Sequence, residues 1–72
     1  MIDDYLLSIA RAYIDLVNDM RSGRYTTQEI RQLDSDRQWH HNELIRLTGL
    51  DPADDMIAHC RRLLHIARSS GQ

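Results

Sequence analysis

Residues 43–63 read ELIRLTGLDPADDMIAHCRRL, and this stretch contains the two helix ends that decide the fold. Gly49 stands where an amphipathic helix stops, and glycine readily takes the positive φ that a helix C-terminus favours. Asp51 and Pro52 follow, and they supply an N-cap carboxylate and a first helical residue whose φ is already set. The sequence therefore predicts that one helix ends at Gly49 and that another begins at Pro52.

The helix before this corner is predicted to run from about Thr27 to Thr48. Thr26 and Glu29 match a capping box, because each side chain can bond the backbone N–H of the other residue. The apolar face of this helix is interrupted by a polar belt near its middle. Its apolar members are Ile30, Leu33, Leu44 and Leu47, and the belt consists of Arg37, His40 and His41.

A first helix is predicted over residues 2–20, with Ser22-Gly23 ending it. Its apolar residues recur at alternating steps of four and three, which indicates a helical seam. The seam is Ile2, Leu6, Ile9, Tyr13, Leu16 and Met20, and Leu7, Ala10, Ile14 and Val17 widen it. A surface helix usually buries a stripe of about 100°, so this helix should contact more than one neighbour. We expect a second copy to be one of them, in a homodimer that buries Leu7, Ile14 and Val17.

The third helix is predicted from Pro52 to about Ser69. Its inward residues are expected to be Met56, Ile57, Cys60, Leu63, Leu64 and Ala67. Acids crowd its first turn and Arg residues lie toward its end, which suits the helix dipole. The fold class is therefore all-α: residues 1–72 form one small three-helix domain, in which a long antiparallel hairpin is closed on one side by the C-terminal helix.

Composition restricts the function classes. The chain has 72 residues, nine Arg, no Lys, eleven acids and a formal net charge of -2. Acids interrupt the Arg clusters, which disfavours a nucleic-acid-binding surface. A domain this short has a small core, so extra burial from a second subunit is expected. The sequence shows no apolar run of membrane-spanning length and no signal-peptide pattern, so we expect a cytoplasmic protein without a membrane segment.

Four His residues and one Cys raise the question of a metal or catalytic site. Two ligands on one helix need a spacing of three or four residues, which His40–His41, His59–Cys60 and His59–His65 lack. Cys60 falls on an apolar stripe, where a buried thiol is inert. We therefore expect no metal, no cofactor and no enzymatic activity.

Residues 47–64, LTGLDPADDMIAHCRRLL, resemble the helix-turn-helix of winged and repressor-type DNA-binding domains. Residues 47–52 match the usual turn into a recognition helix. The resemblance implies a DNA-binding transcriptional regulator that uses the helix 52–69. Recognition helices offer Ser, Thr, Arg, Gln or Asn near their N-terminus, whereas Asp54 and Asp55 would repel phosphates there. Helix-turn-helix-like DNA binding is therefore the alternative function.

Protein interaction is the function that the sequence favours. Trp39 lies roughly opposite the main apolar stripe of its helix, with Arg46 and Leu50 at helical spacing. Either the third helix covers the indole, or the indole anchors a partner, because Trp and Arg dominate interface hot spots. We expect a non-catalytic module, a small regulator or inhibitor that docks on a larger protein. Trp39, Arg46 and Leu50 are the predicted contacts, and Arg24 and Tyr25 form a second candidate group.

An acidic mimic of nucleic acid is a third class of function. Such a protein occupies a basic groove on another protein and needs its acids on one face. Asp3, Asp4, Asp15 and Asp19 give the first helix a partial acidic strip, which Arg11 interrupts.

Overall fold

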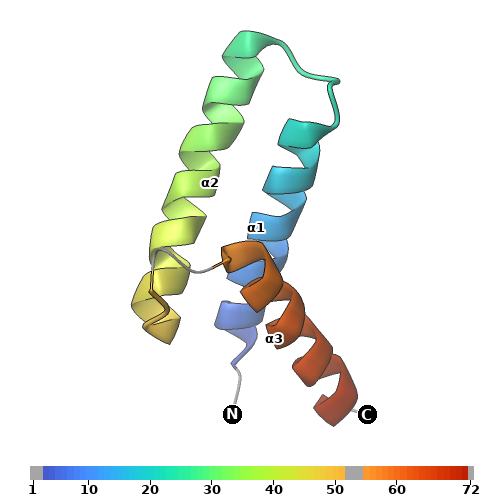
Figure 1. The fold of residues 1–72 in the computed structure, drawn as a ribbon, viewed down its shortest axis with the longest axis vertical. Helices are drawn as coiled ribbons and strands as arrows, with labels where there is room; N and C mark the ends of the chain where they lie inside the picture. Colours follow the sequence, from blue (N-terminus) through green and yellow to red (C-terminus); the bar gives the residue numbers. More distant parts are fainter. Residues whose placement is uncertain (1–2, 52–54, 72) are drawn as a thin grey trace.

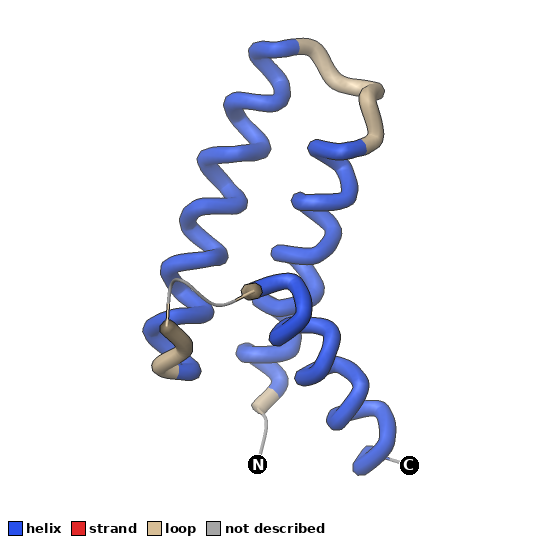
Figure 2. The backbone as a smooth tube through the Cα atoms, viewed as in Figure 1, coloured by secondary structure: helices blue, strands red, loops and turns tan. Residues whose placement is uncertain are grey.

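Three helices make up the computed structural model, which describes residues 3–51 and 55–71. They are α1 (Asp4–Arg21), α2 (Thr27–Thr48) and α3 (Met56–Gly71). Figure 1 shows α1 and α2 as an antiparallel hairpin, with α3 lying across α1. In the described part every regular element is a helix (Figure 2), and the predicted all-α three-helix domain is confirmed. No helix among the described residues is long and apolar enough to cross a membrane.

Local capping bonds account for both ends of α2. The side chain of Thr26 accepts from the N–H of Glu29 at 3.2 Å, and the Glu29 carboxylate accepts from the N–H of Thr26 at 2.8 Å. At the other end Gly49 has φ +71°, and its N–H donates to the carbonyl of Ile45 at 2.8 Å. The predicted capping box, the bounds of α2 and its glycine C-cap are therefore confirmed.

The ends of α1 were predicted less accurately. Asp3 is its N-cap, because the Asp3 carboxylate accepts from the N–H of Leu6 at 2.7 Å. The helix thus starts at Asp4, and the predicted start at Ile2 lies outside the described residues. Ser22 caps the C-terminus and Gly23 has φ +76°, as the Ser22-Gly23 pair predicted.

The helix α3 starts later than predicted. This helix begins at Met56, and the carboxylate of Asp55 accepts from the N–H of Ala58 at 3.2 Å. The carbonyl of Asp55 accepts the first helical bond, from the N–H of His59, at 3.1 Å. Asp55 is therefore the N-cap of α3, while Pro52 and the backbone N–H groups that Asp51 was predicted to cap lie outside the described residues. The segment DPADD contains three Asp residues that could each act as an N-cap, and the sequence pattern does not indicate which of them does.

The core is small and is organised around α1. Among the described residues the buried hydrophobic side chains are Ile9, Ala10, Tyr13, Val17, Leu44, Met56 and Cys60. Four of these seven belong to α1, which packs against both α2 and α3. The prediction that this helix contacts more than one neighbour is confirmed, and both neighbours belong to the same chain. The width of its apolar arc therefore no longer requires a second copy.

The side chains of α3 become less buried toward its C-terminal end. Met56 and Cys60 are buried, but none of residues 61–69 is. Leu63, Leu64 and Ala67 were predicted to face inward and are only half-buried. The second half of α3 therefore keeps apolar surface in contact with solvent.

Candidate protein-binding surface

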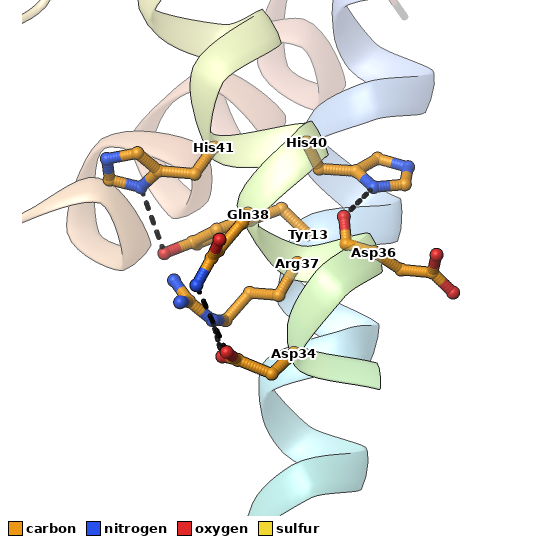
Figure 3. A network of polar contacts seen from close by, with 7 residues as sticks. All are labelled: Tyr13, Asp34, Asp36, Arg37, Gln38, His40 and His41. Carbon is orange, nitrogen blue, oxygen red and sulfur yellow. Dashed lines mark hydrogen bonds and ion pairs between the residues drawn. The ribbon is translucent and has the colours of Figure 1, made fainter. Parts of the chain in front are cut away.

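The side chain of Trp39 is exposed on the outer side of α2. It retains 55% of its accessible surface, because α3 packs on α1 and leaves this side of α2 uncovered. The interpretation in which the third helix covers the indole is therefore wrong. The nearest ring is that of His40, with centroids 5.0 Å apart and an interplanar angle of 78°. Nδ1 of His40 lies 2.7 Å from the carbonyl oxygen of Asp36 (Figure 3), which holds the imidazole in place.

One turn further along α2, a carboxylate joins two helices. Glu43 accepts two hydrogen bonds from Arg46, Nε to Oε1 at 2.7 Å and Nη2 to Oε2 at 2.8 Å. The hydroxyl of Tyr5, on α1, donates to the same Oε2. These bonds from Arg46 and Tyr5 favour the ionised carboxylate and lower the pKa of Glu43 to about 2. The same carboxylate raises the pKa of the Tyr5 hydroxyl.

Together Tyr5, Trp39, Glu43 and Arg46 form what we call the Trp39 surface. The three α2 residues are spaced four and three positions apart, so they follow one side of the helix over about 10 Å. Tyr5 is 48% exposed and the Arg46 side chain 65%. Trp, Tyr and Arg are the residue types that carry most binding energy at protein interfaces. Because Glu43 balances the charge of Arg46, this surface is close to neutral.

The other predicted contacts are distributed unevenly. Leu50 is half-buried and packs against the core, so only part of its side chain is accessible to a partner. Arg24 and Tyr25 are exposed in the turn between α1 and α2, at the far end of the hairpin (Figure 1). The twelve helical positions from Thr27 to Trp39 separate this turn from the indole by about 18 Å. Arg46 therefore lies on the same side of α2 as Trp39, two turns away, whereas Arg24 and Tyr25 lie far from the indole.

Sequence reasoning missed Tyr5 and Glu43. Neither residue is among the contacts that the sequence predicted. Their contact joins residues 38 positions apart, so it depends on how the hairpin pairs. A signal was present: Glu43 and Arg46 are three apart on one helix, a spacing that permits an ion pair.

The predicted polar belt of α2 is divided: His41 contacts α1, whereas His40 lies beside Trp39. Figure 3 shows Nδ1 of His41 pointing at the hydroxyl of Tyr13, 3.4 Å away. On the same face Arg37 donates to the carboxylate of Asp34 at 2.9 Å, and Gln38 donates to its other oxygen at 3.1 Å. Tyr13 is buried while its polar neighbours are half-buried or exposed. The contact between His41 and Tyr13 joins α2 to α1, whereas the two bonds to Asp34 lie within α2.

The groups considered for metal or thiol chemistry are dispersed. Within residues 3–51 and 55–71 no set of three or more His, Cys, Asp or Glu side chains could hold a metal ion. Cys60 is buried, and burial raises the pKa of its thiol to about 11, so the thiol is protonated at neutral pH.

The residues predicted for a dimer interface differ in exposure. Val17 is 8% exposed and belongs to the core of its own chain, so it offers little surface to a second copy. Ile14 is half-buried and packs against that core. Leu7 is half-buried and is not part of the core cluster. Leu7 therefore has the clearest access to a partner.

The corner between α2 and α3 is wider than a helix-turn-helix requires. Residues 49–55 separate the last residue of α2 from the first residue of α3, whereas helix-turn-helix motifs use a turn of about three or four residues. The main contact of α3 is with α1. This arrangement differs from the one that the sequence resemblance implied.

A comparison with protein-family models finds no match, and comparisons with curated proteins and with solved structures find no significant similarity to this chain. The function is therefore inferred from the chemistry of the surface.

Proposed function

We propose that this domain is a non-catalytic protein-binding module, a small regulator or inhibitor that docks on a larger protein through the Trp39 surface. The observation that supports the proposal is the exposed indole of Trp39. It lies on the same side of α2 as Arg46, whose guanidinium is held by two hydrogen bonds to Glu43. Burying a large apolar side chain contributes about 1.5–3 kcal/mol, and a partner that covers the indole would gain that contribution.

Preorganisation of Arg46 also supports a role in binding. Its guanidinium has five N–H donors, and two of its nitrogens, Nε and Nη2, are held by Glu43. The side chain has thus already lost part of the rotamer freedom that ordering at an interface costs. Its remaining donors suit a carbonyl or carboxylate of a partner whose apolar side chain covers Trp39. Because Glu43 balances the charge, binding here should depend weakly on salt.

Affinity capture with matched variants tests the proposal. Immobilised wild-type domain is compared with Trp39→Ala, and the affinity of the captured protein is then measured by isothermal titration calorimetry. Truncating a hot spot should weaken binding by about 30-fold or more, equivalent to about 2 kcal/mol. The variant should keep nearly the wild-type melting point, because the indole is exposed.

Two controls accompany this comparison. Tyr25→Ala changes an exposed aromatic at the far end of the hairpin and should leave the affinity unchanged. Leu44→Ala truncates a fully buried side chain and should lower the free energy of unfolding by about 2–5 kcal/mol. It shows the effect of a destabilised core on the same measurements. Equal capture by the wild type and Trp39→Ala would contradict the proposal. A shift of duplex DNA at low salt that disappears steeply as salt rises would instead support the DNA-binding alternative.

A further inference from the structure

The charges of this chain are divided unevenly between α3 and the remaining residues. Residues 56–72 contain three Arg and no acid, so residues 1–55 carry six Arg against all eleven acids. The formal charge is +3 for the C-terminal stretch and -5 for the preceding one. Arg61, Arg62 and Arg68 are all exposed. None of the three makes an ion pair with any residue that the structure describes.

Helix stability explains one of these Arg residues. Arg68 lies in the last turn of α3, where a cation complements the helix dipole. Arg61 and Arg62 lie near the middle of the helix, and the dipole effect is confined to the first and last turns. Neither an ion pair with a described residue nor the helix dipole therefore accounts for Arg61 and Arg62.

Apolar side chains lie among these cations. Ile66 is 49% exposed and follows Arg62 by one helical turn. Leu63 and Leu64 are half-buried, and none of residues 61–69 is buried. Figure 1 shows this half of α3 extending away from the hairpin. We call the exposed side of α3 that carries Arg61, Arg62, Ile66 and Arg68 the basic face of α3, a surface that combines unpaired guanidinium groups with exposed aliphatic carbon.

We propose that the basic face of α3 binds an acidic segment of another protein that carries apolar residues among its carboxylates. Carboxylates match the guanidinium groups in charge and geometry. Apolar side chains of the segment would cover Ile66, Leu63 and Leu64. This face lies on a different helix from the Trp39 surface, so the two binding activities are separable.

Extended polyanions fit this face less well. Residues 61–68 span about 10 Å along the helix, close to the screening length of about 8–10 Å at physiological salt. A short acidic segment bound here therefore interacts electrostatically mainly with the Arg residues of this face. A DNA duplex or an anionic bilayer is much larger and would also meet residues 1–55, whose formal charge is -5. A phosphate backbone also offers nothing apolar to Ile66, and residues 56–72 lack the Trp and Phe typical of membrane-surface helices.

Fluorescence anisotropy with a synthetic probe tests the inference. The probe is a labelled seven-residue peptide, Leu-Glu-Glu-Leu-Leu-Glu-Glu, which as a helix is about as long as the basic face, and its control has Lys in place of each Glu. The acidic peptide should bind the full chain, with an affinity that falls about tenfold or more between 0.05 and 0.5 M NaCl, while the basic peptide should not bind. Failure of the acidic peptide to bind at 0.05 M NaCl would overturn the inference.

Variants locate the binding. Arg61→Glu with Arg62→Glu should abolish binding of the acidic peptide, and Ile66→Ser should weaken it several-fold. The matched control is Arg11→Glu with Arg31→Glu, which changes the net charge equally at two exposed positions outside α3 and should bind as the wild type does. Circular dichroism confirms that each variant is folded. Equal loss of binding in both double variants would overturn the assignment to α3.

Three further outcomes decide between kinds of partner. Tighter binding to phosphatidylserine vesicles or to a 20-base-pair duplex than to the peptide would overturn the choice of a protein segment. Self-association that disappears in the Arg61→Glu, Arg62→Glu variant would assign the basic face to a second copy and would also overturn it. Trp39→Ala should leave peptide binding unchanged, so failure of this inference is distinguishable from failure of the proposed function.

Discussion

At the scale of single residues, Glu43 shows how one carboxylate organises a surface. It receives two bonds from Arg46 and one from Tyr5, and thereby connects α2 to the first turn of α1. These three bonds, which we call the Glu43 clamp, fix the guanidinium of Arg46 on the same side of α2 as the exposed Trp39. The Trp39 surface is therefore both exposed and ordered, a combination that lowers the entropy cost of binding.

Acid should release this clamp. The folded-state pKa of Glu43 is about 2, below its usual value of 4.5, so its ionised form stabilises the fold. That stabilisation is complete above about pH 4.5 and should be lost as the pH falls toward 2. Melting temperatures across this range should decline less steeply for Glu43→Gln than for the wild type. In an NMR titration, Arg46→Gln should move the Glu43 midpoint back toward 4.5, and an unchanged midpoint would refute the clamp.

At the scale of elements, helix ends follow from local chemistry. Thr26 with Glu29 and the glycine at position 49 define α2, because capping bonds join residues three or four apart. The start of α3 was harder to predict, since several acids precede it. Asp55 is the residue whose carboxylate reaches the N–H of Ala58.

Removing this cap should destabilise α3 measurably. Asp55→Ala should lower the free energy of unfolding by about 1 kcal/mol, because the N–H of Ala58 loses its acceptor. Asp55→Asn keeps an acceptor oxygen and should remain close to the wild type. Urea denaturation followed by circular dichroism measures both. A stability for Asp55→Ala equal to that of Asp55→Asn would show that the cap contributes nothing.

At the scale of the whole molecule, α1 is the central helix and the core it organises is small. It contributes Ile9, Ala10, Tyr13 and Val17 to a cluster completed by α2 and α3. The molecule is elongated, with extents of 39 × 25 × 19 Å. A single core in a chain of this length supplies little stability, and a second subunit is one source of additional burial.

We propose on this ground that the domain forms a homodimer at micromolar concentration, through the edge of α1 that carries Leu7. Light scattering should give twice the monomer mass. Leu7→Glu should yield a folded monomer, because Leu7 is half-buried and outside the core cluster. Ile14→Glu is a less specific variant, since Ile14 packs against the core and its loss should also reduce stability. A wild-type monomer at tens of micromolar would contradict the proposal.

The sequence by itself determined the helical class, the extent of α2, the capping box and the left-handed glycine at its end. These features depend on interactions within four or five residues, which spacing and residue type express directly. It also placed Trp39 and Arg46 on the same side of one helix, because helical periodicity is local.

Only the tertiary structure decided which helix α3 packs on, and with it the exposure of Trp39. It also decided the contact between Tyr5 and Glu43 and the burial of Val17 inside its own chain. The three-helix pattern permits α3 to cover either face of the hairpin, and periodicity does not distinguish these arrangements. The choice depends on the total fit of side chains from all three helices, and that fit arises between residues far apart in sequence.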